Sequence, residues 1–281
     1  MKLTFLGTGA AEGVPAVFCG CETCREVRRR GESAFRTRAQ LLIDGEVCID
    51  FPPDAYYHSL RFGVDLSAIR YLLVTHSHMD HFYAHDFILR GYKYASPIKT
   101  KLQIFGNGEV KKVFDECTRR EMREAVSSLI EVTVVPPFEP FRFGDYVATA
   151  LKAQHGNAEE AYVYLIEREG KSYLHLTDSG RLPVETLDWL EAWAKHVKRV
   201  DFVTFDCTFL FYTAGEISRH MGLGDNKAMQ DEFIRRGIVD GRTQYAITHF
   251  SHNGAPLKER LESVEADYGY IASYDGLSLS F

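Results

Sequence analysis

The seven residues THSHMDH, at positions 75–81, contain three histidines and one aspartate. They follow the apolar run YLLV at 71–74, which predicts a buried β-strand that ends at the first histidine. Imidazole nitrogens and carboxylate oxygens suit borderline divalent ions such as Zn, Mn or Fe. On an extended turn His76 and His78 can face one ion, while Asp80 and His81 continue toward another point. The stretch therefore predicts two ligands for each of two metal ions rather than a polar surface loop.

Three further candidate ligands lie far along the chain: His155 in AQHGN, Asp178 after the run YLHLT, and His249 after the run YAIT. A strand that stops at a ligand holds it on a rigid element, and several such strands can converge on one rim. Taken singly, His155 could be a loop histidine and Asp178 a helix N-cap. Together with the histidine stretch, they predict a complete dinuclear centre.

A dinuclear centre predicts hydrolysis. Two divalent ions roughly 3.5 to 4 Å apart can share a water, lower its pKa from about 16 toward about 7, and hold both the attacked centre and the leaving oxygen. Two such ions against two carboxylates and one hydroxide leave residual positive charge. This favours a small anionic substrate such as a phosphodiester.

The cysteine-rich stretch FCGCETC, at 18–24, predicts a separate metal site. Cys19, Cys21 and Cys24 offer three thiolates, whereas a structural zinc takes four ligands. His252, three residues after His249, is the best candidate for the fourth. Such a zinc contributes roughly 10 to 16 kcal/mol of apparent binding free energy, enough to fix an irregular loop. The alternative is three free thiols.

Short β-rich runs alternate with longer helical segments along the whole chain. Helical character is predicted at 107–126, 183–195 and 225–236, and Asp44-Gly45 and Glu169-Gly170 lie where hairpin turns are expected. The expected strands are KLTFL, AQLLI, EVCID, RYLLVT, KLQIF, LIEVTVV, YVYLIE, KSYLHLT, DFVTF and TQYAITH. No repeat or linker divides the chain. We expect one α/β domain over 1–281, with two packed sheets covered by helices and a small zinc-binding loop at 19–24.

Composition narrows the choice of partners. The chain has 281 residues, 45% of them hydrophobic, which is enough for a large core. Its formal net charge of −6 gives no overall basic footprint for nucleic acid. The sequence has no apolar stretch long enough to span a bilayer, and MKLTFLGTG lacks the apolar region of a signal peptide. We expect a soluble, cytoplasmic protein without a membrane partner.

The order of these motifs resembles the metallo-β-lactamase fold superfamily, whose members are αββα sandwiches with two metals at one edge. Within it, the chain resembles the subgroup that contains the phosphoribosyl cyclic phosphodiesterase of the carbon-phosphorus lyase pathway. The motifs that carry this resemblance are LTFLGTGAAEGVPAVFCGCETC, FRTRAQLLI, THSHMDH, LTDSG, FDCT, THFSH and YDGLSL.

The resemblance implies how the ligands divide. His76, His78 and His155 would hold the first metal, Asp80, His81 and His249 the second, and Asp178 would bridge them. The ions would be manganese or zinc. It also implies a structural zinc on the three cysteines and His252, and a homodimer.

The resemblance further implies that His220, in SRHMG, lies over the dinuclear centre, where it could protonate the leaving group or hold phosphate. Asp80, Asp178 and His220 are thus the expected catalytic residues. Asp206 and Asp275 could orient ligand imidazoles, although Asp275 before a glycine is also a typical turn residue. The stretch 208–224 is long and aromatic and could reshape the pocket.

The leading hypothesis is a dinuclear-metal phosphodiesterase that acts on a small or cyclic phosphate ester. The alternatives are a protein like the pyrroloquinoline quinone biosynthesis B protein, a tRNA 3'-end endonuclease, and a metal-stabilised binding protein without turnover. A tRNA endonuclease would need a basic RNA-gripping arm, and a binding protein would be expected to lack some ligands. The sequence shows neither feature.

Overall fold

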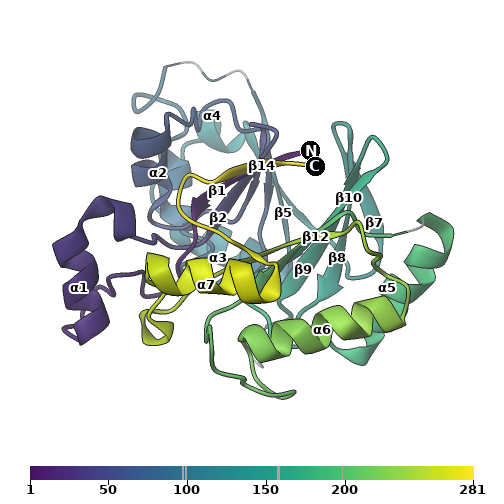
Figure 1. The fold of residues 1–281 in the computed structure, drawn as a ribbon. Coiled ribbons are helices and arrows are strands. Elements are labelled where there is room, and N and C mark those ends of the chain that lie inside the picture. The colour runs from purple at the N-terminus through teal and green to yellow at the C-terminus, as the bar shows by residue number, and fades with distance from the viewer. Residues whose placement is uncertain (97, 99, 157–158, 198) are drawn as a thin grey trace.

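The computed structural model describes residues 1–96, 98, 100–156, 159–197 and 199–281, and its strands form two seven-stranded sheets (Figure 1). The first sheet has the order β14-β1-β2-β3-β4-β5-β6 and the second the order β13-β12-β11-β10-β9-β8-β7. The strands of the first sheet are β1 (Lys2–Gly7), β2 (Gln40–Ile43), β3 (Val47–Ile49), β4 (Tyr71–Leu73), β5 (Leu102–Gly106), β6 (Ile130–Val134) and β14 (Ser278–Ser280). Those of the second are β7 (Pro140–Phe143), β8 (Tyr146–Lys152), β9 (Tyr162–Arg168), β10 (Lys171–Leu176), β11 (Phe202–Asp206), β12 (Gln244–Thr248) and β13 (Ile271–Ala272).

Each sheet has an antiparallel half and a parallel half. The pairs from β14 to β3 and from β7 to β10 are antiparallel, and those from β3 to β6 and from β10 to β13 are parallel. The parallel halves matter for function because the carboxyl ends of parallel strands lie at one edge of a sheet.

Helices cover the outer faces of both sheets (Figure 1). The helices are α1 (Glu22–Arg30), α2 (Ala55–Phe62), α3 (Gly108–Thr118), α4 (Glu124–Ser127), α5 (Val184–Val197), α6 (Leu223–Arg235) and α7 (Lys258–Tyr268), with 3-10 turns η1 (Glu32–Ala34), η2 (Ala84–Leu89) and η3 (His252–Gly254). Phe62 of α2, Phe87 of η2 and Phe114 of α3 pack on the first sheet. Helices α5, α6 and α7 pack on the second. This αββα sandwich confirms the predicted fold class.

Strands in the middle of the sheets, such as β2, β3, β4 and β11, are buried on both faces, which explains their nearly continuous apolar runs. Along β9, Tyr164 and Ile166 point between the sheets, whereas Val163 and Leu165 point toward the helices. Leu3 of β1 belongs to the same inter-sheet core as Tyr164. The two sheets therefore hold each other in register through side chains of alternating strand positions.

All ten strands expected from the sequence are present, and both expected turns join hairpins. Asp44, Gly45, Glu169 and Gly170 all have positive φ, as such turns require. The segment expected to be one helix at 107–126 is instead α3 and the short α4. Strands β7, β8, β13 and β14 and helices α2 and α7 were not expected. Within the described residues, no helix combines the length and the apolar character that crossing a bilayer requires.

Candidate metal centres

The candidate ligands lie just beyond the carboxyl ends of four strands. His76 follows β4, His155 follows β8, Asp178 follows β10 and His249 follows β12. Strand β4 belongs to the first sheet and the other three strands to the second. The ligand cluster therefore spans the edge at which the two sheets meet.

The first group of ligand atoms comes from His76, His78, His155 and Asp178, and all four atoms lie within 4.8 Å of one another. His76 Nε2 is 2.8 Å from His78 Nδ1 and 3.3 Å from Asp178 Oδ2. His155 Nδ1 is 3.2 Å from Asp178 Oδ1. The structure thus brings together the residues expected to hold the first metal and the expected bridging carboxylate.

The second group comes from Asp80, His81, Asp178 and His249, again within 4.8 Å. His81 Nε2 is 3.1 Å from an oxygen of Asp80 and 3.1 Å from Asp178 Oδ2. His249 Nε2 is 4.0 Å from the same Asp178 oxygen. Asp178 belongs to both groups, as a bridging ligand must.

Unpartnered atoms at the centre of the cluster show that these residues fit metal ions. His81 Nε2, His155 Nδ1, Asp178 Oδ1 and His249 Nε2 are buried, and although they lie close to one another, none makes a hydrogen bond of suitable geometry to a described residue. Buried polar atoms are rarely left unpaired in folded proteins, because desolvation without a partner costs about 1–3 kcal/mol each. Four such atoms lie together in this cluster. Binding to divalent ions would give each of them a partner.

Asp178 is ionised in this arrangement. Burial raises the pKa of its carboxyl group, but His249, His220, His76 and His81 outweigh burial and hold the pKa well below its usual value. A carboxylate with imidazoles on several sides is suited to accept two cations.

Two ligand histidines are oriented by residues behind them. His81 Nδ1 lies 2.7 Å from Asp50 Oδ2, and His249 Nδ1 lies 2.8 Å from Thr208 Oγ1 and 3.2 Å from Asp206 Oδ2. Such contacts fix the protonated nitrogen and leave Nε2 free as a ligand. Burial raises the pKa of Asp206, but His220 and His249 outweigh it and lower the pKa to about 2, so Asp206 accepts as a carboxylate.

Asp206 occupies the orienting place that the sequence suggested, but Asp275 does not. Asp275 Oδ1 accepts from Thr8 Oγ1 at 2.7 Å and Asp275 Oδ2 accepts from the Thr37 amide at 2.8 Å. Asp275 therefore contacts no candidate ligand imidazole. The orienting roles of Asp50 and Thr208 were missed. Asp50 directly follows β3, so the strand-end position that marked His76 and Asp178 could have identified it.

Three residues of the centre have strained backbone conformations. Asp50, Asp178 and His249 have φ values of 64°, 54° and 63°, which non-glycine residues seldom adopt. Each follows a strand, and the left-handed turn directs its side chain into the cluster. Strain of this kind costs roughly 1–3 kcal/mol per residue and gathers at functional sites.

The histidine loop is anchored by Glu159, which lies in the connection between β8 and β9. Glu159 accepts from the Ser77 amide at 2.7 Å, from the Ser77 hydroxyl, and from Asn107 Nδ2 at 2.9 Å. Asn107 also caps α3 by accepting from the Val110 amide. The loop that carries four ligands is therefore fixed between two elements rather than free.

His220 lies against the cluster, as the sequence suggested. Its Nδ1 is 2.9 Å from Asp178 Oδ1 and 3.2 Å from Asp206 Oδ2, and its ring stacks on His249. The side chain keeps 24% of its surface exposed. Asp178, Asp206, His220 and His249 form a further group with ligand-like spacing, so His220 could act as a ligand or as a proton donor.

The 208–224 stretch is bonded to the start of α6 and lies against Gly180, two residues after Asp178. Asp225, the third residue of α6, accepts from the amides of Ala214 and Gly215 at 2.7 and 3.1 Å and pairs with Arg181 at 3.0 Å. A Cβ on Gly180 would lie 1.9 Å from the Ser218 carbonyl oxygen, so glycine is required for this close approach.

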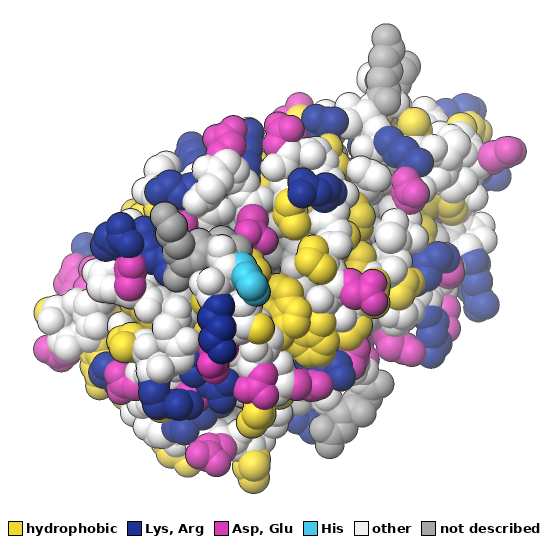
Figure 2. Space-filling view, turned by 90° about the vertical axis from the view of Figure 1, so that its right-hand side faces the viewer, with side chains coloured by type: hydrophobic (Ala, Val, Ile, Leu, Met, Phe, Trp, Pro, Cys, Tyr) yellow, Lys and Arg dark blue, Asp and Glu magenta, His cyan; other side chains and the backbone are white. Residues whose placement is uncertain are grey.

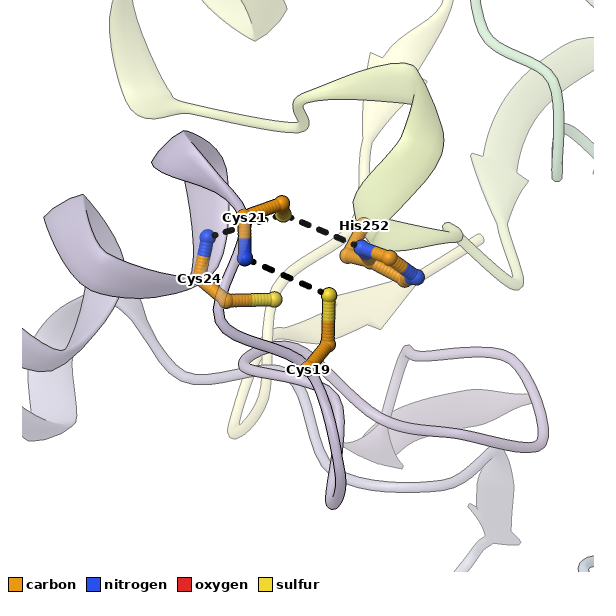
Figure 3. A group of neighbouring side chains, drawn as sticks. All are labelled: Cys19, Cys21, Cys24 and His252. Carbon is orange, nitrogen blue, oxygen red and sulfur yellow. Dashed lines mark hydrogen bonds between the residues drawn. The ribbon is translucent and has the colours of Figure 1, made fainter.

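The cysteine cluster lies on a loop at the start of α1 (Figure 3). Ligand atoms of Cys19, Cys21, Cys24 and His252 lie within 4.8 Å of one another, and Cys21 Sγ is 3.4 Å from His252 Nδ1. None of these cysteines forms a disulfide. The Cys24 amide and His252 lower the pKa of Cys21 to about 6, while burial raises that of Cys24 to about 11. Three thiols and one imidazole at this spacing fit tetrahedral zinc.

Comparison with protein families gives a match to the β-lactamase superfamily domain over residues 47–232. Among curated proteins, an octanoyltransferase of Porphyromonas gingivalis is 29% identical over 99% of this chain, and coenzyme PQQ synthesis protein B of Bradyrhizobium diazoefficiens is 41% identical over 46 residues. The chain spans about half the length of the first, 51%, and the second match covers 16% of this chain and 15% of that protein.

Solved structures with the same fold include a diphosphatase of the PhnP family, with a TM-score of 0.71 and 22% identity over 100% of this chain and 96% of that one. Zinc-bound PqqB from Methylobacterium extorquens has a TM-score of 0.68 and 17% identity, with both chains fully covered. The short form of human tRNase Z has a TM-score of 0.65 and 16% identity over 100% of this chain and 99% of the other.

Proposed function

Because the chain belongs to the β-lactamase superfamily and is a metal-dependent hydrolase, we propose that it cleaves a small or cyclic phosphodiester with two divalent ions. The proposed ligands are His76, His78 and His155 for one ion, and Asp80, His81 and His249 for the other, with Asp178 shared. The observation that carries the proposal is the set of four buried, unpartnered ligand atoms around Asp178.

The pair of ions, manganese or zinc, would supply an activated water and positive charge for the phosphoryl oxygens. The proposed ligand residues offset only part of the positive charge of the two ions. Asp80 and Asp178 are the two carboxylates among the proposed ligands, and the histidines are neutral when they bind metal. A site that keeps net positive charge binds an anionic ester better than a neutral one, which supports a phosphate ester over an amide.

We assign His220 to protonation of the leaving group. Its Nδ1 is held beside Asp178 and Asp206, and part of its side chain is exposed to solvent. Phe209 packs edge-on against the ring and limits its rotation. A positioned imidazole of this kind contributes typically 10²–10⁴-fold to a proton transfer.

We propose a structural zinc on Cys19, Cys21, Cys24 and His252. The ion would join the loop before α1 to η3, three residues beyond His249. Arg28 adds bonds from α1 to the carbonyls of Cys19 and Ala16, at 2.8 and 3.1 Å. On this proposal the zinc loop is part of a single domain over residues 1–281 and supports the edge of the catalytic centre.

Elemental analysis of purified protein, paired with hydrolysis of bis(p-nitrophenyl) phosphate in added Mn, Zn, Ni or Fe, tests the proposal. We expect about three metals per chain, from four ligands at each of three positions, and turnover of the diester. Cyclic ribose phosphates are the next substrates to compare. Three metals without turnover of any phosphodiester would contradict the proposed substrate, and a metal-free folded protein would contradict the whole site.

The short match to coenzyme PQQ synthesis protein B supports a second candidate, a role like that of a coenzyme PQQ synthesis protein. The cysteine cluster is compatible with either candidate. A nucleic-acid substrate has less support, because the net charge is −6 and basic and acidic side chains are interspersed on the face shown in Figure 2. The homodimer expected from the resemblance stays a prediction.

A further inference from the structure

A series of polar groups, all buried except the partly buried Thr37, leads from the C-terminal part of the protein to the dinuclear centre. Its members are Asp275, Thr37, His58, Gln40 and Asp50. Thr37 Oγ1 is 2.6 Å from Asp275 Oδ2 and 2.7 Å from His58 Nε2. His58 Nδ1 is 2.7 Å from Gln40 Oε1, and Gln40 Nε2 donates to the Asp50 carbonyl at 3.1 Å. We call this series the Asp275 chain.

The orientation of Gln40 fixes one proton on His58. The Asp50 carbonyl can only accept, so the Gln40 nitrogen must face it and the Gln40 oxygen must face His58. An amide oxygen also only accepts. His58 Nδ1 therefore carries a hydrogen and donates it.

The Thr37 hydroxyl fixes a second proton by counting. Two short contacts join Asp275 Oδ2, Thr37 Oγ1 and His58 Nε2, and two hydrogen bonds need two hydrogens. The hydroxyl supplies one. The other must be on the Asp275 carboxyl group or on His58 Nε2. An ionised Asp275 beside a neutral His58 would leave two lone pairs facing each other at hydrogen-bond distance.

Burial decides which group holds this proton. The Asp275 side chain is 1% exposed and His58 is 0% exposed, and separated charges are costly in such surroundings. Burial raises the pKa of Asp275, against the hydrogen bonds from Thr37 and Thr8, and burial lowers the pKa of His58 to about 4, so both net changes are in the direction of neutral groups.

The charge of Arg36 opposes this choice by lowering the pKa of Asp275, but burial has the larger effect and the net pKa stays raised. Arg36 donates to Thr8 Oγ1 and to the Ser273 carbonyl rather than to Asp275. Arg61 of α2 approaches Asp275 only to 3.9 Å and pairs with Glu32 at 3.3 Å. Asp54, which faces His58, is paired with Arg38 at 3.2 Å.

We propose that Asp275 is a neutral carboxylic acid that begins a one-way hydrogen-bond chain ending on the backbone of Asp50. Its hydroxyl donates to Thr37, Thr37 donates to His58, His58 donates to Gln40, and Gln40 donates to the Asp50 carbonyl. Donors that all run in one direction polarise and strengthen one another.

The Asp50 end of the Asp275 chain indicates what the hydrogen bonds do for the site. Asp50 has a φ of 64°, and this strained conformation directs its carboxylate to His81 Nδ1 at 2.7 Å. Gln40 holds the carbonyl of the same strained residue. His58 and Asp275 are therefore positioning residues for His81, more than one hydrogen bond away from it. This role rests on the proposed function, since it assigns His81 to a metal.

The protonation states can be measured without substrate or turnover. In protein with ¹⁵N-labelled histidine, loaded with zinc, we expect a His58 signal with a protonated Nδ1 and an unprotonated Nε2. It should not change from pH 8 to about pH 5, because its pKa is about 4. Infrared difference spectra between wild type and Asp275→Asn should contain a protonated carboxyl band. A His58 protonated on both nitrogens, or the lack of that band, would overturn the proposal.

The positioning role needs a variant pair. Thr37→Val removes the hydroxyl that links Asp275 to His58, whereas Thr37→Ser keeps it. Competition with a chelator should show roughly tenfold weaker zinc binding for Thr37→Val and no more than about a twofold change for Thr37→Ser, by comparison with other residues that orient ligands. Equal zinc affinities in the two variants would overturn the role. A phosphodiester assay takes no part in either test, so failure of the proposed substrate would leave both results interpretable.

Discussion

Replacement of Asp178 by alanine tests the dinuclear centre most directly. Asp178 is the residue common to both ligand groups, so its loss takes one ligand from each. Its oxygens lie between 2.9 and 4.0 Å from the nitrogens of five histidines. We expect Asp178→Ala to keep the fold and to lose both paired metal binding and hydrolysis.

The size of the effect follows from the lost charge. Unit charges 4 Å apart attract by about 4 kcal/mol at an effective dielectric constant of about 20. A loss of this size weakens metal binding about a thousandfold. At about 100 times its Kd, an ion stabilises the wild type by about 2.7 kcal/mol, whereas a thousandfold weaker site leaves less than about 0.1 kcal/mol.

Thermal unfolding with and without added metal measures this difference. In protein whose cysteine site already holds zinc, we expect the wild-type Tm to rise by about 5–10 °C on addition of manganese and the Asp178→Ala Tm to stay constant. Asp267→Ala, at an exposed position near the end of α7, is the matched control and should behave as the wild type. An Asp178→Ala protein that keeps the metal-dependent rise in Tm and hydrolyses the diester would refute the bridging assignment.

Three further changes have expected outcomes. Cys24→Ser should reduce zinc content by one ion per chain, measured by elemental analysis, whereas Cys117→Ser, outside the cluster, should not. His220→Ala should lower kcat by about 10²–10⁴-fold with the metal content unchanged, while a loss of metal would make His220 a ligand. Burial lowers the pKa of His175 to about 4, so the unfolded chain binds a proton there that the folded one does not, and stability falls as pH drops from about 6.5 to about 4, by up to about 3 kcal/mol. Urea unfolding of metal-free protein should show this loss, and His175→Asn should reduce the slope.

The candidate ligands of the dinuclear centre could be brought together from the sequence because each one is local to a strand end. A buried strand that stops at His76, Asp178 or His249 has a clear signature in one short stretch. The cysteine spacing is equally local. The family match covers residues 47–232, which include the histidine loop and His220 but not Cys24 or His252.

The supporting residues could not be predicted in this way, because their roles depend on contacts between distant segments. Asp50 meets His81 only because the histidine loop folds back onto β3, where the Phe51 amide donates to the His81 carbonyl. Glu159 reaches Ser77 from the connection between β8 and β9. The short edge strand β14 was missed for a related reason: it depends on pairing with β1, from the other end of the chain, rather than on an apolar run of its own.

The cluster takes His76 from the first sheet and His249 from the second, residues separated by more than half of the chain. Bound ions would therefore cross-link the two layers of the sandwich and close one of the longest loops in the protein. Because an ion held from both layers is released when the layers separate, metal loss is coupled to the unfolding rate. The rate of metal extraction by a strong chelator should then reach a limit that no longer depends on chelator concentration. The fraction of protein that still holds its metal ions would then serve as a measure of kinetic stability.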